Sequence, residues 1–486
     1  TDGTPFIDYY GGNVFNNNGL FTKNGGAGGL AILQEMTFNF NGELNCDNGT
    51  IRLDSRSNLA AGSTITGTGA VHHNGDVHVL GPCTETIADL RLTAGTLTAA
   101  APGAFVGTLS WDLGTIKGVL GVPSGSLLEV VGELEHYLGI DAVLNVDGTL
   151  RWLGPDPLRG YERCTVNILP GGVFDVAADG VLLEDYYTPN TLNIEGQLVK
   201  SGGTETSSVQ FWTIHATGDI ACDTGILSLA AITHLEGGCG FSGSGTTTIG
   251  GTTYLDGATT CTPQIHITSG QFHGAGGVLN GDIMWKGGEL WGTTIVGPSG
   301  HMTIDGPGIK YMNTNAVLQV EGEVDFNEGV VQGNDLCRIE VLAGGRFDVN
   351  APVTLDDYYA TNTFTVQSGG FLSATAGADL SLIGWKMNNN GTATMEDGGQ
   401  AAFHHGGTSS GAFVSEAGGV CEFAAGDQLL QAGATTSGPG TIRVAGGRLI
   451  ADDSVVDGLV HLAGGQLGSS GESGGFRLKD GSTWDT

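Results

Sequence analysis

An aspartate followed by two tyrosines occurs at three places, and it is the most specific repeated polar feature of the sequence. The three Asp-Tyr-Tyr runs are Asp8–Tyr9–Tyr10, Asp185–Tyr186–Tyr187 and Asp357–Tyr358–Tyr359. Exposed tyrosine rings offer flat faces to sugars or to a protein partner, and a carboxylate accepts hydrogen bonds from hydroxyl groups. The alternative is a structural corner, with one tyrosine in the core and the aspartate closing a turn. We therefore treat these nine residues as candidates for ligand or partner contact.

Carboxylates at two of these runs are of the kind that calcium binds. Glu184 precedes Asp185, and Asp356 precedes Asp357. Hard oxygen ligands of this type, helped by neighbouring backbone carbonyls, suit Ca²⁺. The sequence has neither an EF-hand loop nor a Gly-Gly-x-Gly-x-Asp array. We expect a structural calcium at most, and no other cofactor.

The Asp-Tyr-Tyr runs belong to a long internal duplication. The segment that begins CTVNILPGGVFDV at Cys164 matches CRIEVLAGGRFDV at Cys337, and such matches recur at offsets of 172–174 residues. Two module types alternate in the order A-B-A-B-A, within one continuous solenoid. We expect module A at 1–108, 185–282 and 357–486, and module B at 109–184 and 283–356.

A shorter period of about 20 residues recurs inside each module. Short Gly-x-Leu-x-Val-like strands alternate with turns rich in glycine and asparagine. This pattern is typical of a parallel β-helix, or β-solenoid, although chains of antiparallel hairpins resemble it. The apolar pattern of segment 127–138 is compatible with an amphipathic helix. Its copy contains Gly306, Pro307 and Gly308, however, which a helix tolerates poorly. The predicted fold class is therefore all-β, a parallel β-solenoid of about 20-residue coils.

Other side chains with chemical potential have structural interpretations. Cys239 and Cys261 are 22 residues apart, about one coil, so they either form a disulfide or stack as inward-facing thiols. Neighbours on a strand face opposite sides, so the two histidines of a pair, at 72–73 or at 404–405, do not easily bind one metal ion, and we expect these histidines on the surface. The recurring tryptophans are expected in core or corner packing; they are Trp111, Trp152, Trp212, Trp285 and Trp385.

The composition excludes several classes of protein. The 486 residues carry 51 acidic and 18 basic side chains, a formal net charge of −33. This charge disfavours nucleic acid and anionic membranes as partners, and no apolar run approaches the ~18 residues of a membrane-spanning helix. The 86 glycines lack the period of collagen. The start shows no signal-peptide pattern, so we expect a processed product or an internal fragment of a secreted protein.

Catalytic motifs are weak throughout the sequence. The 18 basic residues are dispersed, which argues against a polysaccharide lyase that depends on Arg or Lys. Two Gly-x-Ser-x-Gly-like runs, at 240–245 and 297–302, lack the strand–elbow–helix context of a hydrolase nucleophile. We expect no catalytic residues, although a polysaccharide-degrading enzyme remains the alternative.

The runs GTLSWDLGTIKGVLGVPSGSLLEV, AVLNVDGTLRW and GDIMWKGGELWG resemble repeats of bacterial extracellular and cell-surface β-helix proteins. Autotransporter passengers and large adhesins share this style of Gly-x-Leu strands with a tryptophan at a fixed place. The resemblance implies a rigid extracellular rod with a structural or adhesive role. We expect self-association, with head-to-tail stacking into a filament as the sharper hypothesis, or contact with a glycan surface. The alternative function is a carbohydrate-binding or polysaccharide-degrading β-helix protein.

Overall fold

The protein is built from parallel β-strands stacked turn on turn. The computed structural model describes residues 2–6, 11–26, 28–154, 156–187, 189–359, 362–469, 476–478 and 483–485. Nearly every strand pairs in parallel with the strand three places further along the chain, so three strands make one turn. The predicted β-solenoid is confirmed. In these ranges no helix is long and apolar enough to cross a membrane.

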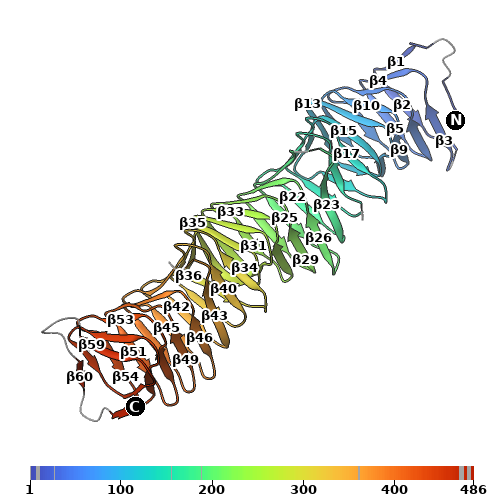
Figure 1. The fold of residues 1–486 in the computed structure, drawn as a ribbon. Helices are drawn as coiled ribbons and strands as arrows, with labels where there is room; N and C mark the ends of the chain where they lie inside the picture. The colour runs from blue at the N-terminus through green and yellow to red at the C-terminus, as the bar shows by residue number, and fades with distance from the viewer. Residues whose placement is uncertain are drawn as a thin grey trace. The chain divides into compact units, whose positions relative to one another are not determined.

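The chain divides into two compact units, and turns of parallel strands stack within each of them (Figure 1). Unit 1 comprises Thr1–His234 and Cys239–Thr247, and unit 2 comprises Leu235–Gly238 and Thr248–Thr486. The bounds of the five predicted modules stay predictions, because the division into two compact units does not show where a repeat begins.

Two corresponding series of twelve strands contain the repeated features. In unit 1 they are β16 (Leu127–Val130), β17 (His136–Leu138), β18 (Val143–Val146), β19 (Thr149–Trp152), β20 (Leu158–Gly160), β21 (Thr165–Ile168), β22 (Val173–Val176), β23 (Gly180–Asp185), β24 (Thr191–Ile194), β25 (Gln197–Lys200), β26 (Thr206–Val209) and β27 (Thr213–Ala216). In unit 2 they are β36 (Glu289–Ile304), β37 (Ile309–Met312), β38 (Val317–Val320), β39 (Glu323–Phe326), β40 (Val330–Gly333), β41 (Arg338–Val341), β42 (Arg346–Val349), β43 (Pro352–Asp357), β44 (Thr363–Val366), β45 (Phe371–Ala374), β46 (Asp379–Leu382) and β47 (Lys386–Asn389).

Strand register follows from the alternation of apolar and polar residues. In β18, β21 and β24 the side chains alternate between half-buried and buried, and Val146, Ile168 and Ile194 stack inward. The matching outward positions form an amide ladder: Asn167 donates to Asn145 at 2.8 Å, and Asn193 donates to Asn167 at 2.7 Å. These register pairs are 22 and 26 residues apart, so the turns are longer here than the predicted 20.

The core contains the predicted tryptophans and one histidine that was placed wrongly. Trp111, Trp152, Trp212, Trp285 and Trp385 are all fully buried, which confirms their role in packing. His73 was expected on the surface but is fully buried, and neither ring nitrogen has a hydrogen-bond partner. Desolvation, with His72 beside it, lowers the pKa of His73 to about 4. The inward side of the strand, and not the polarity of the residue, determines its place.

Candidate functional site

The Asp-Tyr-Tyr corner of unit 1 is built on a buried asparagine. Asn190 Oδ1 accepts a hydrogen bond from the Cys164 N–H at 2.7 Å. Its Nδ2 donates to the carbonyl oxygens of Gly160 at 3.2 Å and Tyr187 at 3.0 Å, and to Asp185 Oδ1 at 2.6 Å. One fully buried side chain therefore ties two neighbouring turns together and holds the backbone that carries the tyrosines.

A buried tryptophan closes this corner from the following turn. Trp212 donates from Nε1 to the carbonyl oxygen of Glu184 at 3.1 Å. Gly160 has no space for a side chain, because an added Cβ would lie 2.6 Å from Asn190 Nδ2 and 2.8 Å from Trp212 Cζ2. Gly160, Cys164, Asn190 and Trp212 thus form one packed group, which we call the corner frame.

The corner frame recurs in unit 2 as Gly333, Cys337, Asn362 and Trp385. Asn362 Oδ1 accepts from the Cys337 N–H at 2.7 Å, and Trp385 Nε1 donates to the carbonyl oxygen of Asp356 at 2.7 Å. An added Cβ on Gly333 would lie 2.5 Å from Asn362 Nδ2 and 2.7 Å from Trp385 Cζ2. The same four residue types therefore pack in the same way in both units.

Both tyrosines of each corner face solvent. Tyr186, Tyr187, Tyr358 and Tyr359 are between 54% and 65% exposed, and each pair meets edge to face. The alternative that placed one tyrosine in the core is therefore wrong at the two described runs. The aspartate does close the turn in unit 2, where Asp357 Oδ1 accepts from the Tyr359 N–H at 2.7 Å. The third run, at residues 8–10, lies outside the described residues.

In unit 1 the exposed Tyr186 and Tyr187 continue into a row with the half-buried Tyr161 and Tyr137 of the preceding turns. Ring centroids are 5.2 Å apart between Tyr137 and Tyr161, 5.3 Å between Tyr161 and Tyr186, and 5.0 Å between Tyr186 and Tyr187. We call these four residues the tyrosine row. Their rings are tilted or edge-on to one another and not stacked flat.

Charged groups beside the tyrosine row are already paired. The Arg159 guanidinium contacts the carboxylates of Glu135 and Glu184, the latter at 2.7 Å. Tyr137 donates from its hydroxyl to Glu135. This arrangement holds the row in place and leaves its aromatic surface as the part that a partner would meet.

Unit 2 breaks the row at one position. Tyr311 corresponds to Tyr137, but Asn334 stands where unit 1 has Tyr161. Gln332 likewise replaces Arg159, so the carboxylate of Asp356 has no corresponding arginine to pair with. The two corners share a buried frame and differ on the outside.

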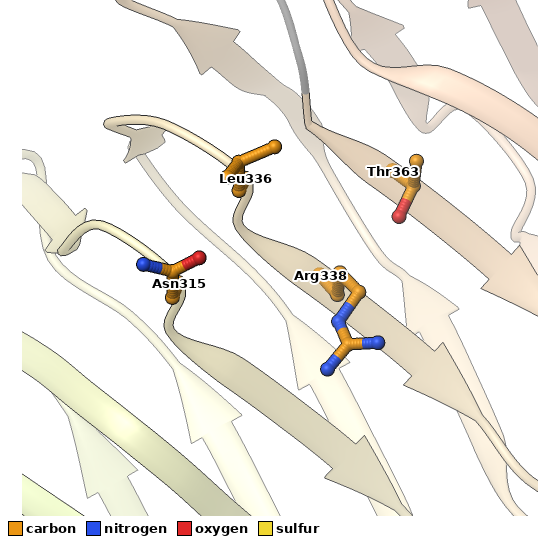
Figure 2. A pocket seen from close by; sticks show the side chains of 4 residues that line it. All are labelled: Asn315, Leu336, Arg338 and Thr363. Atoms are coloured by element: carbon orange, nitrogen blue, oxygen red, sulfur yellow. The ribbon is translucent and has the colours of Figure 1, made fainter.

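A shallow hollow of about 290 Å³ lies beside the unit 2 corner (Figure 2). In unit 1, Arg163 pairs with Asp141 through two contacts of 2.6 and 2.9 Å. In unit 2, Leu336 and Asn315 take these places with the same left-handed backbone, and the leucine is half exposed. The hollow is therefore the counterpart of an ion pair. Its lining residues are Asn315, Leu336, Arg338 and Thr363.

The cysteines of the two corner frames are buried thiols. Cys164 Sγ lies 3.1 Å from the carbonyl oxygen of Gly139, and Cys337 Sγ lies 3.1 Å from that of Asn313. Burial raises the pKa of both, that of Cys337 to about 11. Cys239 is also a buried thiol, which favours the inward-thiol alternative over a disulfide. Because Cys261 belongs to the other unit, their pairing stays a prediction.

The residues predicted to bind calcium have protein partners in the structure. Glu184 pairs with Arg159, and Asp185 Oδ1 accepts from Asn190. Burial raises the pKa of Asp185, against the effect of that hydrogen bond. Asp356 Oδ1 accepts from the Asp357 N–H at 2.9 Å. A calcium ion at either corner stays a prediction.

A different acidic cluster was missed in the sequence. Glu323, Asp325 and Asp348 each place a carboxylate oxygen within 4.8 Å of the others. Asp325 and Asp348 are 23 residues apart, and only the register of β39 on β42 makes them neighbours. The duplication contained a signal, since Asp325 stands where the first copy has Arg151.

No protein-family model matches the sequence, and no curated protein matches it. Among solved structures, the crystal structure of the TibC-catalyzed hyper-glycosylated TibA fragment 55–350 is similar at 14% identity and a TM-score of 0.21. The match covers 83% of this chain and all of that fragment. The β-solenoid itself confirms the resemblance in architecture, and it identifies the class of protein as a β-helix repeat protein.

Proposed function

We propose that this chain is a structural and adhesive β-solenoid protein of the extracellular surface, and that it makes contacts through the exposed tyrosines of its corners. The observation that carries the proposal is the tyrosine row of unit 1, four rings at 5.0–5.3 Å spacing on a buried frame. A rigid frame beneath exposed aromatic rings lowers the entropy lost when a partner is bound.

The proposed role is binding and not catalysis. Around the row, Glu135 and Glu184 share Arg159, and Asp185 accepts from Asn190. Carboxylates engaged in this way support the tyrosines, whereas acid–base catalysis needs a carboxyl group directed at a substrate.

A glycan surface is the partner that this geometry suits best. Tyrosine rings stack on the apolar faces of sugars, and neighbouring amides and carboxylates accept hydrogen bonds from hydroxyl groups. The carbohydrate-binding alternative and the adhesive role therefore use the same surface. A glycan array tests the binding, and a reducing-sugar assay on the bound glycans tests turnover. Binding without turnover is expected; turnover would replace the proposal by the polysaccharide-degrading alternative.

Head-to-tail association is the finer form of the proposal. Within each unit, successive turns are joined by parallel backbone hydrogen bonds, so a turn without a neighbour offers the same pattern to another copy. Electron microscopy over a range of protein and salt concentrations tests this. Filaments that lengthen with concentration are expected, and particles of one size under all conditions would exclude self-assembly.

A further inference from the structure

The acidic cluster of unit 2 lies on two neighbouring strands. Asp325 on β39 pairs in register with Asp348 on β42, and Glu323 lies two residues before Asp325 on the same side of its strand. The three carboxylate oxygens lie within 4.8 Å of one another. Two oxygens that share one Ca²⁺ at 2.3–2.6 Å are at most about 5.2 Å apart. The spacing is therefore that of ligands to a common ion.

Asp348 provides a second, independent sign of a ligand. Its side chain is more than nine-tenths buried, and its Oδ2 accepts from Arg346 Nε. Its Oδ1 is buried and has no hydrogen-bond partner. A buried carboxylate oxygen without a partner is costly, and beside Asp325 the cost rises through like-charge repulsion. A cation between the two carboxylates removes both costs.

The first copy shows what occupies this place when no ion is needed. There Arg151 stands at the position of Asp325, and it donates to Asp175 Oδ2 at 2.8 Å. Arg151 also lies 3.6 Å from Glu129. The other oxygen of Asp175 accepts from Ser201. The counterpart of Asp348 is thus fully partnered, and a guanidinium supplies the positive charge.

The positive groups near the cluster in unit 2, His301 and Arg346, leave Asp348 Oδ1 without a partner. His301 Nε2 lies 2.9 Å from Asp325 Oδ2, and Asn350 Nδ2 donates to Asp325 Oδ1 at 3.0 Å. These contacts orient the carboxylate and leave room for further coordination, because each oxygen has two lone pairs. Arg346 lies on β42, in register with Glu323 of β39, and its guanidinium binds Asp348 Oδ2.

We propose that Glu323, Asp325 and Asp348 bind a calcium ion that joins two turns of the solenoid, in the place that Arg151 occupies in the first copy. Water completes the coordination on the exposed side, where Glu323 lies. This site is distinct from the calcium predicted at the Asp-Tyr-Tyr corners.

Isothermal titration calorimetry with Ca²⁺ on the full chain, freed of metal with a chelator, tests the proposal. Asp325→Asn and Asp348→Asn are each expected to lower the stoichiometry by one ion, or to weaken that site at least tenfold. Asp175→Asn is the matched control, because it changes the equivalent carboxylate beside Arg151, and it is expected to leave Ca²⁺ binding unchanged.

Asp325→Arg rebuilds the arrangement of the first copy. This variant is expected to lose the same calcium ion and to lose the rise in thermal midpoint that Ca²⁺ gives the wild type. The proposal is overturned if the wild type takes up no Ca²⁺, or if the stoichiometry and affinity are the same in the wild type and in all three variants at Asp325 and Asp348.

Discussion

The two Asp-Tyr-Tyr corners are the same inside and different outside. Each has a glycine with no space for a Cβ, a cysteine N–H bound by a buried asparagine, and a buried tryptophan that donates to a carbonyl oxygen. Outside, unit 1 has a continuous tyrosine row and Arg151, whereas unit 2 has Asn334 and Asp325 at the corresponding positions.

This difference separates what folds the chain from what the chain does. The corner frame is repeated because a buried polar network tolerates no partial replacement. The exposed positions on the outside of the solenoid can change more freely, since replacing one exposed side chain alters the free energy of unfolding little. Stability in this molecule is therefore expected to depend on the buried positions that the copies share, and function on the exposed positions. The following predictions test that division.

The largest effect is expected from removing the buried asparagine. Asn190→Ala leaves the Cys164 N–H without its partner and removes the hydrogen bond to Asp185 Oδ1, and the local loss of stability is expected to be about 3 kcal/mol or more. Asn362→Ala is expected to act in the same direction in unit 2. Hydrogen–deuterium exchange of peptides from each corner measures the loss.

Asn193→Ala is the control for this experiment, because Asn193 belongs to the outward ladder and its loss is expected to cost under ~1 kcal/mol. Equal exchange in Asn190→Ala and Asn193→Ala would contradict a structural role for the frame.

The stability of the folded protein is expected to fall in acid because of His73. Segment 66–81 (TGTGAVHHNGDVHVLG) resembles segments 242–257 (SGSGTTTIGGTTYLDG) and 437–452 (SGPGTIRVAGGRLIAD), in which Ile249 and Val444 stand at the place of His73, and all three residues are buried. Because the pKa of His73 is lowered to about 4, the unfolded chain binds a proton that the folded chain does not. This contribution to stability is complete above pH ~6.5 and is lost as the pH falls toward 4, by about 3 kcal/mol.

His73→Ile is therefore expected to flatten the pH dependence of the thermal midpoint between pH 6.5 and 4. Its stability is expected to rise at neutral pH as well, because the two unpartnered ring nitrogens are removed. Parallel curves for the wild type and the variant would show that His73 does not titrate as described.

A smaller loss is expected at the glycine of the frame. Gly333→Ala forces a methyl group against Asn362 and Trp385, which costs about 1–3 kcal/mol by overpacking. Gly308→Ala is the matched control in the same unit, since an added Cβ there meets nothing within 4 Å. Calorimetric unfolding measures the loss of stability in both variants. A larger loss in Gly308→Ala than in Gly333→Ala would contradict the packing described.

The smallest change in stability is expected at the exposed tyrosines. Tyr186→Ala and Tyr187→Ala remove rings that face solvent, so unfolding is expected to shift by no more than ~0.5 kcal/mol. Binding to a glycan surface is expected to fall in the same variants. A large loss of stability would assign these tyrosines to the frame and not to the contact surface.

Much of the architecture was predictable, because it depends on local pattern and on the duplication. Alternation indicated strands, and Pro307 in the copy of segment 127–138 excluded a helix. The structure there has β16 and β17 with a turn between them. The acidic cluster was not predicted, since turns of 17 to 27 residues shift which outward residues meet. His73 was predicted at the surface, but it is buried because its side chain lies on the inward face of its strand.

A reciprocal exchange in the tyrosine row tests the central claim most directly. Tyr161→Asn gives unit 1 the broken row of unit 2, and Asn334→Tyr completes the row of unit 2 between Tyr311 and Tyr358. Both positions lie outside the corner frame, so the fold is expected to be unchanged. On a glycan array, Tyr161→Asn is expected to lower binding and Asn334→Tyr to raise it. Equal binding by the wild type and both variants would contradict a contact surface at the tyrosine row.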